Sequence, residues 1–170
     1  MKFAFGWILI LLLTAASLRA QVLEQSFSDT EAGFRISTPS GQWHLEPRGI
    51  DPGPLRATIR FESALDQFVP NVTVRVTELQ SPEVKAEQAL RADLESLPPN
   101  IEILERKKLQ AGQVAGFELL LHDPANRKVF QQRFFVAKGK SFVITCTSDK
   151  ESYSRMRRDF QKILDSFALL

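Results

Sequence analysis

The stretch GFRISTPSGQW, from Gly33 to Trp43, is where the expected fold of this chain first becomes visible. Apolar and polar residues alternate from residue 34 to residue 38, which is typical of a half-buried strand. The Pro-Ser-Gly turn at residues 39–41 ends that strand, and the tryptophan begins a second short one. We interpret the stretch as a structural corner, with the Trp43 ring packed in the core over the strand it follows.

The same period-two alternation recurs further along the chain. It is clear at residues 55–61 and 72–76, and the later strand-like segments are rich in Ile, Val and Phe. These later segments are 101–109, 114–123, 128–137 and 141–147. Lys138-Gly139 predicts a tight hairpin turn between the last two. Short links make these strands antiparallel, and the last one, apolar on both faces, is expected at the centre of the sheet.

Two helices are predicted. The first opens at Ser81, which suits the N-cap, with a proline in the first helical position, and it ends before Pro98-Pro99. The second runs from Ser148 to Phe167 and begins with a capping box of Ser148 and Glu151. Its apolar face repeats at helical spacing: Tyr153, Met156, Phe160, Ile163, Leu164 and Phe167. Together these elements predict an α+β fold, a central antiparallel β-sheet flanked by helices.

The first twenty residues differ from the rest, and residues 1–20 are expected to be a secretory signal peptide. Lys2 supplies the positive start, residues 3–13 the apolar run, and residues 14–20 the small residues before a cut after Ala20. A cut after Ala16 and retention of the segment as an uncleaved anchor are the alternatives. Residues 21–32 are expected to be a flexible lead-in, and residues 33–170 a single domain.

Charge and cysteine placement narrow the choice of compartment and partner. No cysteine lies near the cut, so we expect a protein that is soluble after cleavage, is not a lipoprotein, and is exported to a periplasm or its equivalent. Lys2 and Arg19 account for the whole excess of 22 basic over 20 acidic residues, which leaves the remainder with a net charge near zero. A neutral chain lacks the basic footprint of nucleic-acid or lipid-surface binding, so neither partner is expected.

Catalytic chemistry has little support in this sequence. The histidines, His44 and His122, are not accompanied by a nucleophile elbow, an HExxH pair or a phosphate-binding glycine loop. His122 and Asp123 are adjacent, and neighbours on an extended chain point in opposite directions. Cys146, the single cysteine, is interpreted as a small buried hydrophobe with a free thiol. We therefore predict that the protein is not an enzyme and has no cofactor.

Two kinds of binding site are compatible with the loops. An alternative function, metal or small-ligand binding, would use His44 and Glu46 on one face of a strand, with the Asp51 loop closing over them. The favoured function is partner binding through apolar residues that loops hold on a rigid sheet. The candidates are Ile50, Leu55, Phe68 and Val69. The competing interpretation is that these side chains pack under their own loops.

The order of these motifs resembles that of PsbP-like proteins. The stretch GFRISTPSGQW is similar to their Gly-Phe-x-Ile-x-x-Pro-x-Gly-Trp opening, with Gln42 as an extra residue before the tryptophan. The resemblance continues through NVTVRV, QVAGFELLL, FQQRFFVAKGKSFVITCT and FQKILDSF, and covers about residues 32–167.

This family includes an extrinsic photosystem II subunit, a nuclear Ran-binding protein and exported bacterial proteins of the DcrB type. Its members are mostly non-catalytic binding or assembly factors. The resemblance therefore implies a sheet flanked by helices and an interaction or assembly module of the cell envelope, whose partner is another envelope protein. It assigns no site residue, and this chain lacks the lipid-anchor cysteine of many bacterial relatives.

Overall fold

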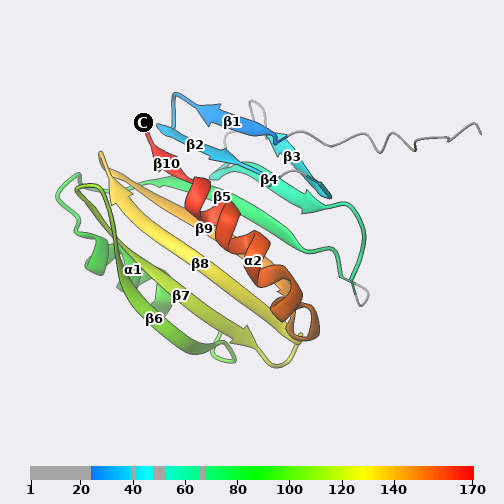
Figure 1. The fold of residues 1–170 in the computed structure, drawn as a ribbon. Coiled ribbons are helices and arrows are strands. Elements are labelled where there is room, and N and C mark those ends of the chain that lie inside the picture. The colour runs from blue at the N-terminus through cyan, green and yellow to red at the C-terminus, as the bar shows by residue number, and fades with distance from the viewer. Residues whose placement is uncertain (1–23, 40, 48–52, 66–67) are drawn as a thin grey trace, which may run out of the picture.

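The computed structural model of the protein describes residues 24–39, 41–47, 53–65 and 68–170. These residues form two antiparallel sheets and two helices (Figure 1). The large sheet has seven strands, in the spatial order β3 (Trp43–Pro47), β4 (Leu55–Phe61), β5 (Asn71–Glu78), β9 (Lys140–Asp149), β8 (Lys128–Ala137), β7 (Val114–Asp123) and β6 (Glu102–Ala111). The small sheet has three strands, ordered β1 (Ser26–Asp29), β2 (Phe34–Ser37) and β10 (Ala168–Leu169).

The two helices lie on opposite faces of the large sheet. Helix α2 (Lys150–Ser166) packs across β9 and β8 and also contacts β2, so it fills the space between the two sheets (Figure 1). Helix α1 (Ala86–Glu95) packs against β8 from the other face. The predicted α+β architecture, an antiparallel sheet flanked by helices, is confirmed. Neither of the two helices in the described residues is both long enough and hydrophobic enough to cross a membrane.

The larger core lies between α2, the small sheet and the β3–β4–β5–β9 part of the large sheet. Trp43 is 1% exposed. Its ring centre lies 5.1 Å from that of Phe61 and 5.8 Å from that of Phe160. The indole Nε1 donates a hydrogen bond to Oδ2 of Asp159 at 3.1 Å. The tryptophan is therefore part of the core, as predicted, and it joins the sheet to α2.

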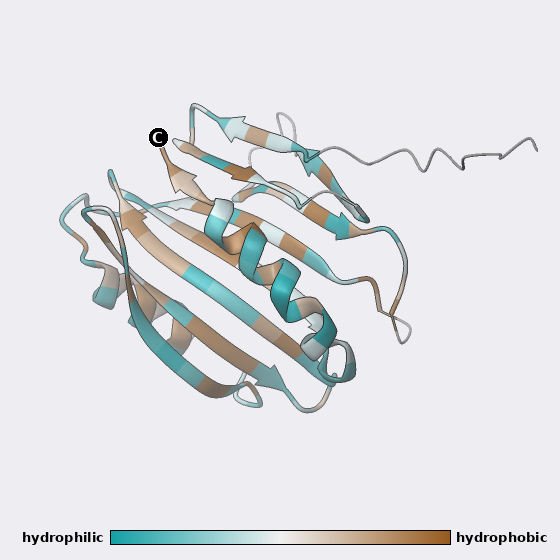
Figure 2. Cartoon of the chain, viewed as in Figure 1, coloured by the Kyte–Doolittle hydropathy of each residue, from teal (hydrophilic) through white to brown (hydrophobic). Residues whose placement is uncertain are grey.

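The outward face of α2 is polar, as the helical spacing of its apolar residues predicts. Figure 2 shows that the surface of α2 turned away from the sheet is hydrophilic. Beneath it, Phe160 and Ile163 are fully buried, while Phe167 is only partly buried. A second, smaller core lies under α1, where Leu90 packs on Phe117 and Phe134. The sheet is thus covered by apolar contacts on both faces, which agrees with a central position for β9.

Several element boundaries differ from the prediction. Helix α1 begins at Ala86 and not at Ser81, because the Ser81 hydroxyl accepts the Glu83 amide at 3.2 Å in a preceding turn. The Gln88 side chain then accepts the backbone amide of Lys85, at the N-cap of the helix, at 3.0 Å. The predicted hairpin turn at Lys138-Gly139 is confirmed, with φ values of 51° and 73° at its two residues.

The predicted capping box of Ser148 and Glu151 is wrong. Strand β9 continues through Asp149, so Ser148 is a buried strand residue, and the Glu151 carboxylate pairs with Arg127 instead.

The predicted flexible lead-in also requires correction. Residues Ser26–Asp29 form β1, which pairs with β2 in an antiparallel register that runs from Ser26 opposite Ser37 to Asp29 opposite Phe34. Gln25 adds a further tie, because its side-chain oxygen accepts the Leu45 amide at 2.8 Å. From residue 24 onward, the described part of this segment is therefore bound to the domain.

Candidate functional site

The predicted metal ligands are only partly brought together. His44 and Glu46 lie on the same face of edge strand β3, as their spacing predicts. The Glu46 carboxylate, however, lies 3.4 Å from Nε of Arg60 on β4, so a cation already neutralises it. Asp51 lies outside the described residues. Within the part of the chain that the structure describes, no group of three or more His, Cys, Asp or Glu side chains converges on a metal position.

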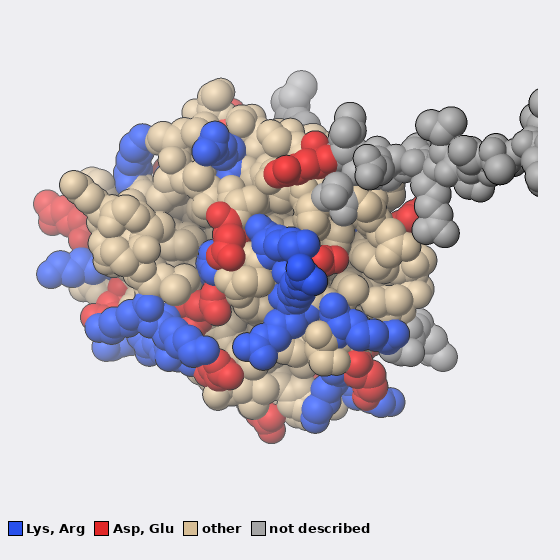
Figure 3. All heavy atoms as spheres, viewed as in Figure 1, with Lys and Arg blue, Asp and Glu red and all other residues tan. Residues whose placement is uncertain are grey.

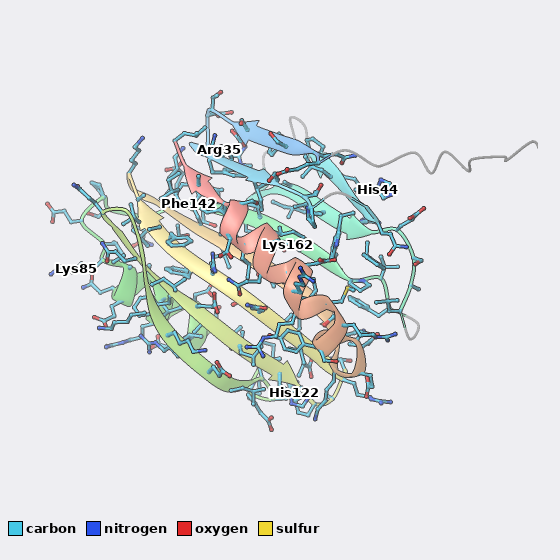
Figure 4. All side chains as sticks on the ribbon, in the orientation of Figure 1. Arg35, His44, Lys85, His122, Phe142 and Lys162 are labelled. Carbon is cyan, nitrogen blue, oxygen red and sulfur yellow. The ribbon has the colours of Figure 1, made fainter. Side chains whose placement is uncertain are left out.

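The two histidines occupy separate parts of the large sheet. Figure 4 labels His44 near one edge and His122 near the opposite edge. The Nδ1 atom of His122 lies 3.1 Å from Oε2 of Glu102 on the neighbouring strand, and the ring is almost buried. Asp123 accepts hydrogen bonds from Asn126, at 2.7 Å, and from Asn100, at 2.9 Å. These bonds, led by the one from Asn126, lower the pKa of the Asp123 carboxyl and stabilise a turn.

Cys146 is a buried free thiol, as predicted. Its side chain is fully buried between β5 and β8, in the middle of β9. Burial raises the pKa of the thiol well above its ordinary value, because the protein interior disfavours the thiolate. Because the thiolate is the form that attacks electrophiles and binds metals, this burial disfavours both roles for Cys146.

The candidate partner-binding residues lie at two ends of one strand. Leu55 begins β4 and is partly buried, whereas Phe68 and Val69 belong to the loop that follows the end of β4. Ile50 lies outside the described residues. The described candidates therefore do not form a single patch, and of the three only Val69, at 38% exposure, is an exposed large apolar side chain.

The Phe68 ring is held by the sheet. The Lys128 ammonium lies 3.4 Å from the ring centre of Phe68, a cation–π contact, and 2.6 Å from Oδ1 of Asp149. Both Lys128 and Asp149 are largely buried at the ends of neighbouring strands. This contact ties Phe68 to the end of the sheet, while the neighbouring Val69 stays exposed at the surface.

An exposed pair of apolar side chains on β6 was not predicted. Ile103 is 49% and Leu104 is 53% exposed on β6, an edge strand of the large sheet. A bulge between Ile103 and Glu105 interrupts the pairing with β7 at this point. Four charged residues follow, at 105–108. Bulges and charges are the features by which edge strands avoid pairing with other chains, so we interpret β6 as a protected edge.

The charge on the α2 side is mixed. Figure 3 shows Lys and Arg side chains interspersed with Asp and Glu over this face. Part of this mixture is a chain of ion pairs: Arg133 bridges Glu118 on β7, at 2.9 Å, and Asp165 on α2, at 2.7 Å. This face therefore carries charges of both signs and does not present a continuous basic surface.

A groove on the opposite face of the sheet was also missed. It lies between α1 and β5, has a volume of about 620 Å³, and is lined by Phe134 and Val143 of the sheet and by Ala92 of the helix. Arg75 from β5 and Asp93 from α1 also line it. The groove depends on how far α1 stands from β5, and no local sequence pattern encodes that distance.

The fold is shared with solved structures, although the sequence has no close match. No protein-family model matches the chain, and no curated protein matches it. The structure of cyanobacterial PsbP (CyanoP) from Synechocystis is similar, with a TM-score of 0.64 and 14% identity over 93% of this chain and 99% of that one. LpqN, involved in cell envelope biogenesis of Mycobacterium tuberculosis, gives a TM-score of 0.61 and 15% identity over 86% of this chain and 90% of LpqN.

A protein of unknown function from Pseudomonas aeruginosa is a third similar structure. Its TM-score is 0.59, with 9% identity over 84% of this chain and 94% of that chain. Together the three likenesses cover most of the chain and show that it has a PsbP-like fold.

Proposed function

We propose that the protein is an exported, non-catalytic interaction module of the cell envelope. Its likeness to LpqN, a protein involved in cell envelope biogenesis, supports the envelope role. The order of positive, apolar and small residues in the first twenty positions supports export. The predicted partner is another envelope protein. The apolar residues in or beside the loops, Ile50, Leu55, Phe68 and Val69, remain its proposed contacts.

The strongest support for this proposal is the position of Val69 beside the anchored Phe68. The exposed Val69 side chain follows directly after Phe68, which is anchored to the sheet by its contact with Lys128. An exposed apolar residue on a fixed loop loses little conformational entropy when a partner covers it. This combination favours a preformed contact surface at this end of the sheet.

The proposal is tested by replacing the exposed residue alone. We expect Val69→Ser to weaken capture of a partner from the envelope fraction, measured by pull-down and quantified by mass spectrometry. Leu104→Ser is the matched control, because Leu104 is exposed as well but lies on β6, at the opposite edge of the sheet from β3. Both variants should keep the wild-type unfolding midpoint, because exposed substitutions change stability little.

The outcomes separate the competing interpretations of the loop residues. A partner lost with Val69→Ser and kept with Leu104→Ser supports the module. Equal capture by both variants, or no partner for the wild type, contradicts it. The double variant Phe68→Ala, Ile50→Ala then asks whether the rest of the proposed surface contributes. For export, N-terminal sequencing of protein from the exported fraction should find a start after Ala20, whereas an intact Met1 on membrane-bound protein would favour an anchor.

A further inference from the structure

The groove between α1 and β5 has the dimensions and lining of a small-ligand site. Its volume of about 620 Å³ lies within the range typical of ligand pockets, roughly 300–1,000 Å³. Phe134 and Val143 supply an apolar base. On the helix side, Ala89 and Ala92 have short side chains, so the helix does not fill the space above that base. An apolar group of a few carbon atoms therefore fits against the sheet.

Two opposite charges line the same groove without pairing with each other. Neither Arg75 nor Asp93 makes a side-chain hydrogen bond or salt bridge with another residue in the described ranges. Asp93 is half-buried, and this burial raises the pKa of its carboxyl, while the more distant charge of Arg75 opposes the shift. A carboxylate in this position has lost part of its hydration and has gained no direct partner in return.

Several other charged residues of the large sheet form salt bridges. Arg60 pairs with Glu46, Lys140 with Glu78 at 3.3 Å, and Arg133 with Glu118. Arg75 and Asp93, by contrast, line one groove without forming such a pair. A ligand with a negative and a positive group could satisfy both residues at once, whereas a simple anion would be repelled by Asp93 and a simple cation by Arg75.

We propose that this groove binds a small apolar zwitterion, such as the two free ends of a short apolar peptide. Its carboxylate binds the Arg75 guanidinium, its ammonium group binds the Asp93 carboxylate, and an apolar side chain packs on Val143 and Ala92. Guanidinium and carboxylate groups form the strongest hydrogen bonds available to such a ligand. This site is separate from the Val69 loop, and the inference does not rest on the proposed envelope function.

The test uses a dipeptide whose charges can be removed one at a time. Leucyl-leucine, N-acetyl-leucyl-leucine and leucyl-leucine amide are titrated into the full protein by calorimetry at low salt. We expect the free dipeptide to bind about tenfold more tightly than either blocked form, which corresponds to about 1.4 kcal/mol per charge contact. Ala92→Leu, which places a larger apolar side chain in the groove, should abolish binding of all three.

Charge variants identify which residue recognises which end. Arg75→Gln should bind the free and the amidated dipeptide equally, and Asp93→Asn should bind the free and the acetylated dipeptide equally. Arg91→Gln is the matched control, because Arg91 lies on α1 but does not line this groove, and it should keep the wild-type preferences.

The same titrations can overturn the proposal. The absence of heat with millimolar free dipeptide, equal affinity for the free and both blocked forms, or preferences that persist in both charge variants would each do so. Because partner capture through Val69 is measured separately, failure here leaves the proposed function standing.

Discussion

Single positions in the large sheet tolerate little change, and Gly116 is the clearest example. A Cβ at this position would lie 2.5 Å from the backbone oxygen of Phe134 and 2.5 Å from the ring of Phe135. The backbone oxygen cannot move without disturbing the β7–β8 pairing. We expect Gly116→Ala to lower the free energy of unfolding by about 1–3 kcal/mol, the usual cost of overpacking.

Urea denaturation measures this effect, and Gly53→Ala is the control. A Cβ at Gly53 has nothing within 4 Å. Similar midpoints for the two variants would show that the strands can separate at Gly116 at no cost.

The half-buried carboxyl of Asp93 should reduce stability at neutral pH. Its pKa is raised by burial, so folding favours the protonated form. Such a group contributes its full stability below the unfolded pKa, about 3.9, and loses that contribution as the pH rises through the folded pKa. Asp93→Asn should therefore be more stable than the wild type at pH 7, and this advantage should disappear in acid.

Asp123→Asn provides a comparison of opposite sign. Hydrogen bonds lower the pKa of Asp123, so its contribution is present above the unfolded pKa and is lost as the pH falls through the folded pKa. This variant should be less stable than the wild type at pH 7. Thermal unfolding of both variants from about pH 3, roughly one unit below the pKa of an ordinary Asp, to about pH 7, well above it, measures the two trends. Parallel curves would contradict the assignment.

At the scale of elements, α2 joins the two sheets. Phe160 is fully buried and contacts Trp43 on β3, while Ser166 binds β2 through hydrogen bonds to the amide and carbonyl of Ser37, both at 2.9 Å. We expect Phe160→Ala to lower the free energy of unfolding by about 3–5 kcal/mol, as deletion of a core aromatic ring usually does.

The exposed Arg158 of the same helix supplies the comparison for Phe160. Arg158→Ala should stay within about 0.5 kcal/mol of the wild type. Both values come from denaturant titrations followed by circular dichroism. An unchanged midpoint for Phe160→Ala would contradict the docking of α2.

Element type could be predicted wherever the apolar pattern is long. In strands β4 and β5, apolar and polar residues alternate over at least three residue pairs. In helix α2, the apolar face repeats over at least two turns. Strand β1 could not be predicted, because SFSD is short and polar and is held by pairing with β2. Strand β10 has two residues and forms because it pairs with β2.

The candidate sites depended on tertiary structure to a greater degree. The same-face placement of His44 and Glu46 follows from strand periodicity, but the contact of Glu46 with Arg60 requires the β3–β4 register. Arg75 and Asp93 are 18 positions apart by their numbers and lie on different elements, so nothing local indicates that they line one groove. Strand and helix periodicity therefore predicted which face each side chain lies on. Its neighbours could be identified only from the structure.

At the scale of the whole molecule, Cys146 reports on global unfolding. It lies in β9, paired with Val72 on one side and Gln131 on the other, and no local opening exposes it without breaking the centre of the sheet. We expect the thiol to resist a bulky disulfide reagent in the native protein and to react at a rate set by the unfolding equilibrium. Labelling across a urea series measures this rate. Rapid labelling without denaturant would contradict the fold at its centre.

The small sheet also has a consequence for how the chain is made. Its middle strand, β2, is synthesised early, but it pairs with β10 and its Phe34 stacks on Phe167, with ring centres 5.7 Å apart. A ribosome releases the N-terminal residues first, so this strand emerges long before the residues that complete its surroundings. Until then the nascent polypeptide lacks the contacts that close its core. The small sheet can therefore close only after Phe167 and β10 have been synthesised, so its assembly comes late in the folding of the chain.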